Sequence, residues 1–297
     1  MASRSKTQHI HEDAATLDAL IKAAGKGSVA DVKQILSVDP DAAMRFTPTG
    51  QTALHAAAEH GRIGCVRLLL PLSDPNETTG MGWTPLFEAI CNRHEAVARA
   101  LAKKTNLAAI TPMGETHLGF ACSMGWMPAV QILLPLCDAR QPDGKGRTPL
   151  MKSVEARNAA IFDFVIPASD VNAVDAAGSS VLTLAVRHGH SHAVKALLAQ
   201  GARCEWITEG ENLNVLALAI QLGVWDCAEV LSERAPNECL LAEAASEKAV
   251  ENNSRIPRLM ARAESISLSQ VVKSAQPRPT APDASNHQSI ARRARSL

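Results

Sequence analysis

Gly82-Trp83-Thr84-Pro85-Leu86 and Gly146-Arg147-Thr148-Pro149-Leu150 are two copies of one phrase in this chain of 297 residues. The phrase belongs to a ladder of glycines that fall 32 residues apart. The glycines of this ladder are Gly50, Gly82, Gly114, Gly146, Gly178 and Gly210. A fixed period of this length indicates one supersecondary unit that is copied and stacked, so the sequence predicts a repeat solenoid. Stacked repeats offer an extended surface for binding.

Each copy predicts a pair of helices. The residue two positions after the glycine, such as Thr84, can cap a first helix with its hydroxyl, and Pro85 suits the first helical position, where no N–H is needed. A second apolar stretch follows, as in Val66-Arg67-Leu68-Leu69-Leu70, with the i, i+3, i+4 spacing of an amphipathic helix. We therefore expect each repeat to consist of a turn, a short helix, a tight connection and a second helix.

One residue between the two helices is expected to adopt the left-handed conformation that closes a helix. This position holds Gly61, Arg93, Gly125, Arg157, Gly189 and Gly223. Glycine adopts that conformation without strain. Arg93 and Arg157 depart from the pattern, and the left-handed geometry should cost each of them roughly 1 kcal/mol.

The repeats resemble those of the ankyrin family, whose unit carries Gly-x-Thr-Pro-Leu-His-x-Ala-Ala in a period of about 33 residues. A close match is Gly50-Gln51-Thr52-Ala53-Leu54-His55-Ala56-Ala57-Ala58, and residues 171–178 are similar to the family's inter-repeat hairpin. The resemblance covers residues 14–236. It implies an all-α repeat solenoid of about seven stacked helix-turn-helix repeats with short β-hairpin or turn connections. It also implies that His55 has a structural role, tying neighbouring loops together.

The ends of the chain differ from the repeats. We expect disorder over residues 1–13 and an N-terminal capping helix pair after them, because terminal repeats need a polar outer face. Residues 237–272 are predicted to form C-terminal capping helices. Residues 273–297 contain several prolines and few apolar side chains, with five Lys or Arg against one Asp. This basic tail is therefore predicted to be disordered.

The composition argues against several functional classes. Lys and Arg together number 30, as do Asp and Glu, so no net field favours nucleic acid or an anionic membrane. The chain has seven cysteines with no Cys-x-x-Cys pair, no secretory signal and no apolar run of membrane-spanning length. These features predict a soluble protein of a reducing compartment, either the cytoplasm alone or the cytoplasm and the nucleus. They also predict that the protein binds neither a metal nor a cofactor.

Two stretches resemble chemical motifs, but their context favours structural roles. The run His188-Gly189-His190-Ser191-His192 has the composition of a metal site, yet it lies at an interhelical turn, where ankyrin repeats commonly carry Gly-His. Gly25-Lys26-Gly27-Ser28 is similar to the end of a P-loop but lacks the earlier glycine and a preceding strand. Paired catalytic carboxylates and activated nucleophiles are likewise not evident. The sequence therefore predicts a protein that is not an enzyme.

The resemblance also predicts where a partner would bind. In ankyrin arrays the hairpin tips and the last exposed turn of each first helix line a concave groove. The candidate partner-binding residues at these positions are Met81, Trp83, Asn92, Met113, Met124, Lys145, Arg147 and Arg187. Glu115, Ser123, Glu155, Ser179 and His188 share these positions.

The candidates change from apolar to basic along the array. Met and Trp suit adaptable binding surfaces, and Trp is a frequent energetic anchor. We therefore expect a protein partner with an apolar anchor near Trp83 and acidic residues toward Arg147 and Arg187. Trp83 has a second interpretation, in which it packs on the neighbouring hairpin.

The predicted function is a non-catalytic protein–protein interaction scaffold or adaptor. An alternative is an adaptor that recruits ubiquitin-ligase or membrane-sorting machinery through its C-terminal region, since Pro279-Thr280-Ala281-Pro282 matches a motif that docks into a sorting-machinery domain in other proteins. Such an extended Pro-rich segment loses little entropy on binding. The remaining alternative is an enzyme with an active site in the groove.

Overall fold

The protein is an elongated stack of seven helix pairs within residues 2–204 and 215–234, which are the residues that this computed structural model describes. The first pair, repeat 1, consists of α1 (Ala2–Lys26) and α2 (Val29–Val38), followed by the short 3-10 helix η1 (Pro40–Met44). The inner helices of repeats 2 to 7 are α3 (Ala53–Glu59), α5 (Pro85–Cys91), α7 (His117–Ser123), α9 (Pro149–Glu155), α11 (Val181–Arg187) and α13 (Val215–Gln221). The outer helices are α4 (Ile63–Leu69), α6 (Glu95–Ala102), α8 (Met127–Leu133), α10 (Ala159–Val165, continued by η2, Ile166–Ala168), α12 (Ser191–Ala199) and α14 (Trp225–Arg234).

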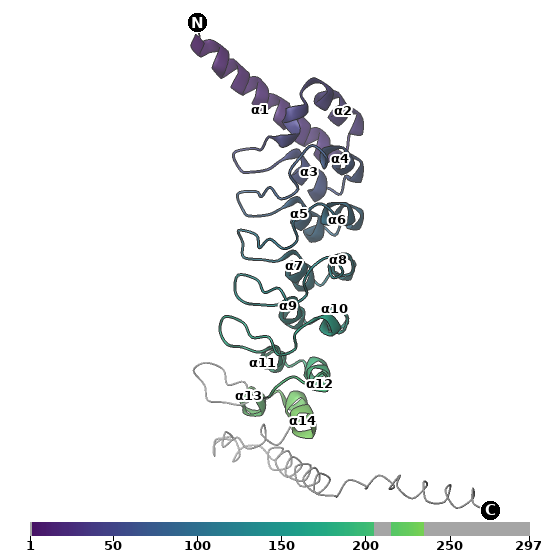
Figure 1. The fold of residues 1–297 in the computed structure, drawn as a ribbon, viewed down its shortest axis with the longest axis vertical. Helices are drawn as coiled ribbons and strands as arrows, with labels where there is room; N and C mark the ends of the chain where they lie inside the picture. The colour runs from purple at the N-terminus through teal and green to yellow at the C-terminus, as the bar shows by residue number, and fades with distance from the viewer. Residues whose placement is uncertain (1, 205–214, 235–297) are drawn as a thin grey trace, which may run out of the picture.

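The three parts of each repeat form three parallel columns. Figure 1 shows the inner helices in the middle, the outer helices at one side and a row of loops projecting at the other. We call the tips of these loops the fingers, which are residues 47–51, 79–83, 111–115, 143–147 and 175–179. Each finger is closed by two backbone hydrogen bonds; in the second, Thr79 N donates to Trp83 O at 2.9 Å and Gly82 N to Thr79 O at 2.7 Å.

The ladder glycines are required by their conformation, and several of them also by space. All five in the described fingers have positive φ, from 73° to 80°. A Cβ on Gly50 would lie 2.7 Å from the carbonyl oxygen of Thr78, and one on Gly146 would lie 2.6 Å from the backbone nitrogen of Ala176. The glycines thus allow each finger to lie directly on the next, which explains why the ladder dominates the sequence.

Side-chain caps start the inner helices at the predicted positions. The hydroxyls of Thr52, Thr84, Thr116, Thr148 and Ser180 each accept a hydrogen bond from the backbone N–H three residues later. Pro85 and Pro149 stand at the first helical position. Helices of only seven residues need such caps together with tertiary packing, because isolated helices of that length are not stable in water.

The core lies between the inner and outer helices and is made of small aliphatic side chains. The positions seven residues after the ladder glycines are fully buried and hold Ala57, Ala89, Ala121, Ser153 and Ala185. At the serine, the hydroxyl donates to the Leu150 carbonyl at 2.6 Å, which satisfies this polar group inside the core. Small residues let adjacent inner helices approach closely, so a thin layered protein can have a continuous core without many aromatics.

The left-handed turn between helices also occurs where it was predicted. Gly61, Gly125 and Gly189 have φ between 64° and 69°, and Arg93 and Arg157 adopt φ of 59° and 54°. The two arginines differ in their contacts. Arg157 donates through Nη2 to the His188 carbonyl at 2.7 Å, whereas no hydrogen bond or ion pair of the Arg93 side chain is found within the described chain.

Replacing Arg93 by glycine should therefore raise the free energy of unfolding by up to about 1 kcal/mol, because the left-handed strain is removed and no contact is lost. Arg157→Gly is the matched comparison, since it removes the same strain together with the bond to His188. We expect it to stabilise less or to destabilise. Urea unfolding of both variants measures the difference, and equal effects would contradict the explanation.

One expectation differs from the structure in detail. Helix α1 begins at Ala2, where disorder was expected over residues 1–13, because the amphipathic helix that packs on α3 continues backward without a breaker. The connections between repeats were expected to be hairpins or turns; in the described residues they are turns, with one isolated bridge between Val174 and Ser180. The predicted C-terminal caps (237–272) and basic tail (273–297) lie outside the described residues. None of the helices in the described part has both the length and the apolarity needed to cross a membrane.

Candidate partner-binding surface

The predicted binding residues lie on one side of the array, which we call the inner surface. It comprises the exposed parts of the fingers and the ends of the inner helices. Met81 and Met113 occupy neighbouring finger tips, with 76% and 50% of their surfaces exposed. Lys145 is exposed on the next finger, and Asn92 and Arg187 are exposed at the ends of α5 and α11. The structure thus brings the apolar candidates together in repeats 3 and 4.

The fingers of repeats 3 and 4, which carry Met81 and Met113, lack the backbone hydrogen bond that joins other neighbouring fingers. Gly80 N donates to Thr49 O at 2.7 Å, and Ala176 N donates to Lys145 O at 3.0 Å, so both pairs of fingers share a backbone hydrogen bond. Pro112 stands at the corresponding place between repeats 3 and 4 and has no N–H to donate. Instead, Met113 packs on the preceding finger, where a Cβ on Gly82 would lie 2.9 Å from its Cγ. Side-chain packing replaces the hydrogen bond between these two fingers.

Trp83 packs on the following repeat and keeps part of its surface exposed. Its ring packs edge-on against Phe120 with the centroids 6.1 Å apart, and Phe120 packs in turn on the buried ring of Phe87 at 4.5 Å. Its backbone carbonyl accepts a hydrogen bond from His55 Nε2 at 2.9 Å, the tie between neighbouring loops that the ankyrin resemblance implied. Trp83 and Phe120 nevertheless remain partly exposed. We call Met81, Trp83, Met113 and Phe120, with the partly buried Met124, the apolar cluster.

Two basic residues of repeat 5, Arg147 and Lys152, form ion pairs within the protein. Arg147 Nη1 lies 2.5 Å from Glu155 Oε1, so the guanidinium bridges its own finger and the end of α9. Lys152 is buried, with only 6% of its surface exposed, and its Nζ lies 2.9 Å from both Glu115 Oε1 and Asp143 Oδ2. These ion pairs lock the fingers of repeats 4 and 5 to α9.

The titration of the buried ion pairs agrees with their geometry. Burial opposes the charged form of Lys152, but hydrogen bonds to Glu115 and Asp143 outweigh it and raise the pKa of the ammonium. Burial also opposes the ionised form of Asp143, yet the bonds from Lys152 and from two backbone N–H groups hold the pKa of that carboxyl below its usual value. Lys152 and Asp143 therefore both stay charged near neutral pH.

In repeats 2 and 3, two carboxylates lack ion pairs of the kind found in repeat 5. Glu88 on α5 is half-buried, and Glu59 ends α3, the helix that packs beside it. Burial raises the pKa of the Glu88 carboxyl, and the charge of Glu59 raises it further, whereas His60 acts in the opposite direction. Within the described chain neither carboxylate pairs with a lysine or arginine; Glu59 has only His60 Nδ1 at 3.9 Å.

The histidine run at residues 188–192 binds the preceding repeat. Arg157 donates through Nε to His190 Nε2 at 3.2 Å, and His192 Nε2 lies 2.8 Å from Asp163 Oδ1. Burial lowers the pKa of His190, and the charge of Arg157 lowers it further. These contacts give the run the structural role that its phase predicted. Among the residues with defined placement, no three potential metal ligands gather.

His117 is a buried histidine that the sequence interpretation missed. It occupies the helix position where Pro85 and Pro149 stand in other repeats, and its Nε2 lies 3.3 Å from Thr84 Oγ1. Its ring packs on Phe87 at 4.8 Å, and burial lowers its pKa to about 4. With 1% of its surface exposed, this histidine is closed to substrates and joins repeats 3 and 4.

The position six residues after the ladder glycine was also missed. It holds Glu88, Phe120 and Lys152 in three successive repeats. The candidates were chosen from the finger tips and the last turn of each first helix, and this position belongs to neither. A change of residue type could have identified this position, because the repeats on either side hold the aliphatic residues Ala56 and Leu184 there.

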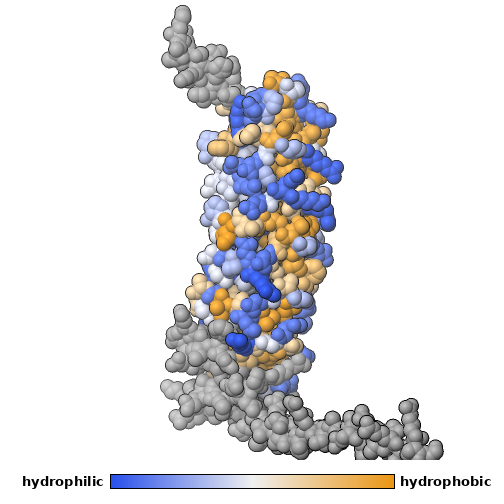
Figure 2. Space-filling model, in the orientation of Figure 1, coloured by the Kyte–Doolittle hydropathy of each residue, from blue (hydrophilic) through white to orange (hydrophobic). Residues whose placement is uncertain are grey.

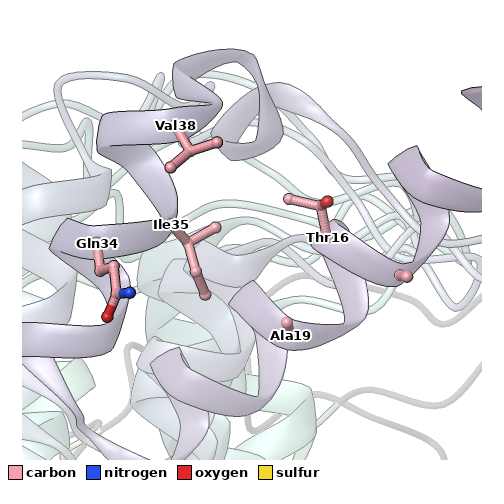
Figure 3. Close-up of a pocket in the computed structure, with 6 residues that line it drawn as sticks. Thr16, Ala19, Gln34, Ile35 and Val38 are labelled. Atoms are coloured by element: carbon pink, nitrogen blue, oxygen red, sulfur yellow. The ribbon is translucent and has the colours of Figure 1, made fainter.

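Two open hollows flank α1 at the N-terminal end of the array. One lies between α1 and α2, where Figure 3 shows Thr16, Ala19, Gln34, Ile35 and Val38 along its walls. The other is lined by residues including Leu17, Met44 and Phe46. Both are lined mainly by apolar groups and lie away from the predicted binding residues. Figure 2 shows polar and apolar side chains interspersed along the visible face of the array. Pro279, Thr280, Ala281 and Pro282 lie outside the described residues.

The sequence and fold match known repeat proteins. A profile for ankyrin repeats in three copies matches residues 20–110 and 156–241, more than half of the chain. Rabankyrin-5 of Mus musculus is 31% identical over 168 residues, which cover 54% of this chain and 14% of that protein. Ankyrin repeat protein nuc-2 of Neurospora crassa is 26% identical over 198 residues, which cover 64% of this chain and 18% of that protein.

Two further matches concern a shorter protein and a solved structure. Ankyrin repeat-containing protein C6C3.08 of Schizosaccharomyces pombe is 31% identical over 113 residues, which cover 36% of this chain and 47% of that protein. The chain therefore spans less than half the length of each of these relatives. The crystal structure of the ankyrin repeat domain of Bcl-3 superposes with a TM-score of 0.65 at 25% identity, covering 72% of this chain and 97% of that domain. Together with the glycine ladder and the paired helices, these matches show that the chain belongs to the ankyrin-repeat family.

Proposed function

We propose that this protein is a non-catalytic scaffold or adaptor that binds a protein partner on the inner surface of repeats 3 and 4. Ankyrin repeats are protein–protein interaction modules, and the apolar cluster supports this location. Large apolar side chains that are grouped and exposed commonly mark interaction sites. The Trp83 ring is held by Phe120, so it offers contact area with little loss of conformational freedom on binding.

The test is capture of partners by the full chain and by matched variants. In the site variant, Trp83→Ala and Met113→Ala remove two members of the apolar cluster. We expect a partner to bind this variant at least about tenfold more weakly than wild type, as befits loss of a tryptophan anchor. The control is Phe164→Ala, which removes an exposed aromatic ring from the outer helix α10. Equal binding by all three proteins would place the partner site elsewhere.

The second candidate function, recruitment of ubiquitin-ligase or membrane-sorting machinery, depends on the C-terminal region. The motif from Pro279 to Pro282 favours it as a sequence observation. A chain that ends at residue 272 separates the two candidates, because partners of the inner surface should be retained and partners of the tail lost. Pro282→Ala in the full chain is the finer control.

A further inference from the structure

The two sides of the apolar cluster differ in whether their charged side chains form ion pairs within the protein. On the side of repeat 5, Arg147 is paired with Glu155, and Lys152 is paired with Glu115 and Asp143. On the side of repeat 2, Glu59 and Glu88 lie on the packed helices α3 and α5, and within the described chain neither carboxylate pairs with a lysine or arginine. Two carboxylates without such a partner therefore lie beside the cluster on this side.

The carboxylate of Glu88 belongs to the same part of the surface as the aromatic rings. Glu88 follows Phe87, which packs on Phe120, and it holds in repeat 3 the position that Phe120 holds in repeat 4. Helix α3, which ends at Glu59, packs on α5 from the other side. A bound segment that places an apolar side chain on Trp83 and Phe120 would thus carry its neighbouring residues past Glu88.

We propose that the partner is a protein segment in which a lysine or arginine lies a few residues from the apolar anchor, with the cation bound between Glu59 and Glu88. This inference rests on the proposed function and specifies the chemistry of its partner. A cation at this place would relieve the mutual repulsion of the two carboxylates, and a charge-assisted hydrogen bond to a half-buried carboxylate is stronger than one in open solvent. The pair of carboxylates would also fix the direction in which the segment crosses the repeats.

The residue types that bind this surface can be determined by selecting a phage-displayed library of random dodecapeptides on the full chain. Enriched peptides should share an aromatic residue, leucine or methionine with a lysine or arginine within about three or four residues. The most enriched peptide is then synthesised and its affinity measured for wild type and for variants. We expect Glu88→Gln to weaken binding roughly tenfold at low salt and to reduce its salt dependence.

Two controls make the result specific. Glu229→Gln removes an exposed carboxylate from the outer helix α14 and should leave the affinity unchanged. Trp83→Ala should abolish binding of the same peptide, which shows that cation and anchor act at one site. Circular dichroism of each variant checks that the array remains folded.

The outcomes separate this inference from the proposed function. Enriched peptides that lack a cation, or whose binding is unaffected by Glu88→Gln, overturn the inference but leave an apolar binding surface in place. A library that yields no peptide sensitive to Trp83→Ala contradicts both. A third outcome concerns the chain itself, because Ile290 and Leu297 flank Arg292, Arg293 and Arg295 in its own tail. If a synthetic peptide of residues 287–297 binds in a Glu88-dependent way and removal of the tail from the chain tightens peptide binding, the occupant is the chain's own tail and the partner proposal is wrong.

Discussion

Lys152→Met is expected to lower the free energy of unfolding by about 3 to 5 kcal/mol, the range observed when one partner of a buried ion pair is removed. The ammonium lies 2.9 Å from carboxylate oxygens of both Glu115 and Asp143. Methionine fills a similar volume, so the loss arises from two carboxylates left without their cation. Asp143 is itself almost fully buried and would remain charged at neutral pH at a high desolvation cost. Urea denaturation at pH 7 measures the change.

Two further variants test whether charge is the cause. Lys145→Met removes an exposed lysine from the finger that carries Asp143 and should change stability by less than about 0.5 kcal/mol. The triple variant Lys152→Met, Asp143→Asn, Glu115→Gln removes all three charges and should recover much of the loss, because buried ion pairs can often be replaced at little net cost. If the triple variant is no more stable than Lys152→Met, the loss comes from packing and not from the unpaired charges.

The fold was predictable from sequence because each local requirement recurs at a fixed period. The fingers need glycine at one position because φ is positive there, so Gly50 to Gly178 mark every described finger. The caps at Thr52 to Ser180 and the buried small residues at Ala57 to Ala185 repeat in the same register. The two positions where arginine replaces glycine were also predicted correctly, since Arg93 and Arg157 keep the left-handed conformation. A repeat imposes the same geometry many times, and that redundancy is what makes it visible.

The site was predictable only in part, because its chemistry depends on side-chain contacts both within and between repeats. The sequence placed Met81, Trp83 and Met113 on the fingers from their phase alone. It gave no means of seeing that Arg147 is neutralised by Glu155, which was itself among the surface candidates, or that Lys152 reaches two fingers. Pairing depends on distances in the folded chain, and each of these ion pairs occurs once, so no periodicity reveals it. The charges that remain available to a partner could be identified only from the structure.

Acidification should destabilise the array through His117, by about 3 kcal/mol between pH 7 and pH 4. The pKa of this histidine is about 4 in the folded protein against 6.5 for an unperturbed imidazole. Between these values the unfolded chain binds a proton at this site and the folded chain does not, so stability is complete above pH 6.5 and is lost as the pH falls toward 4. His55 and His190, whose pKa values are also lowered by burial, act in the same direction. Urea unfolding at half-unit steps of pH gives the slope.

The contribution of His117 to this loss of stability can be measured by substituting the residue that other repeats hold at the same position. His117→Pro restores the Thr-Pro-Leu phrase of repeats 3 and 5, at a helix position where proline needs no N–H partner. Whatever this change does to stability at pH 7, it should remove about 3 kcal/mol from the loss between pH 7 and pH 4, because no proton can bind there in either state. Ala53→Pro, which introduces proline at the equivalent position of repeat 2 without changing a titratable group, is the matched control and should leave the slope unchanged. Parallel pH profiles for wild type and His117→Pro would mean that the imidazole is protonated in the folded protein, and that the contact between repeats 3 and 4 accommodates a charge.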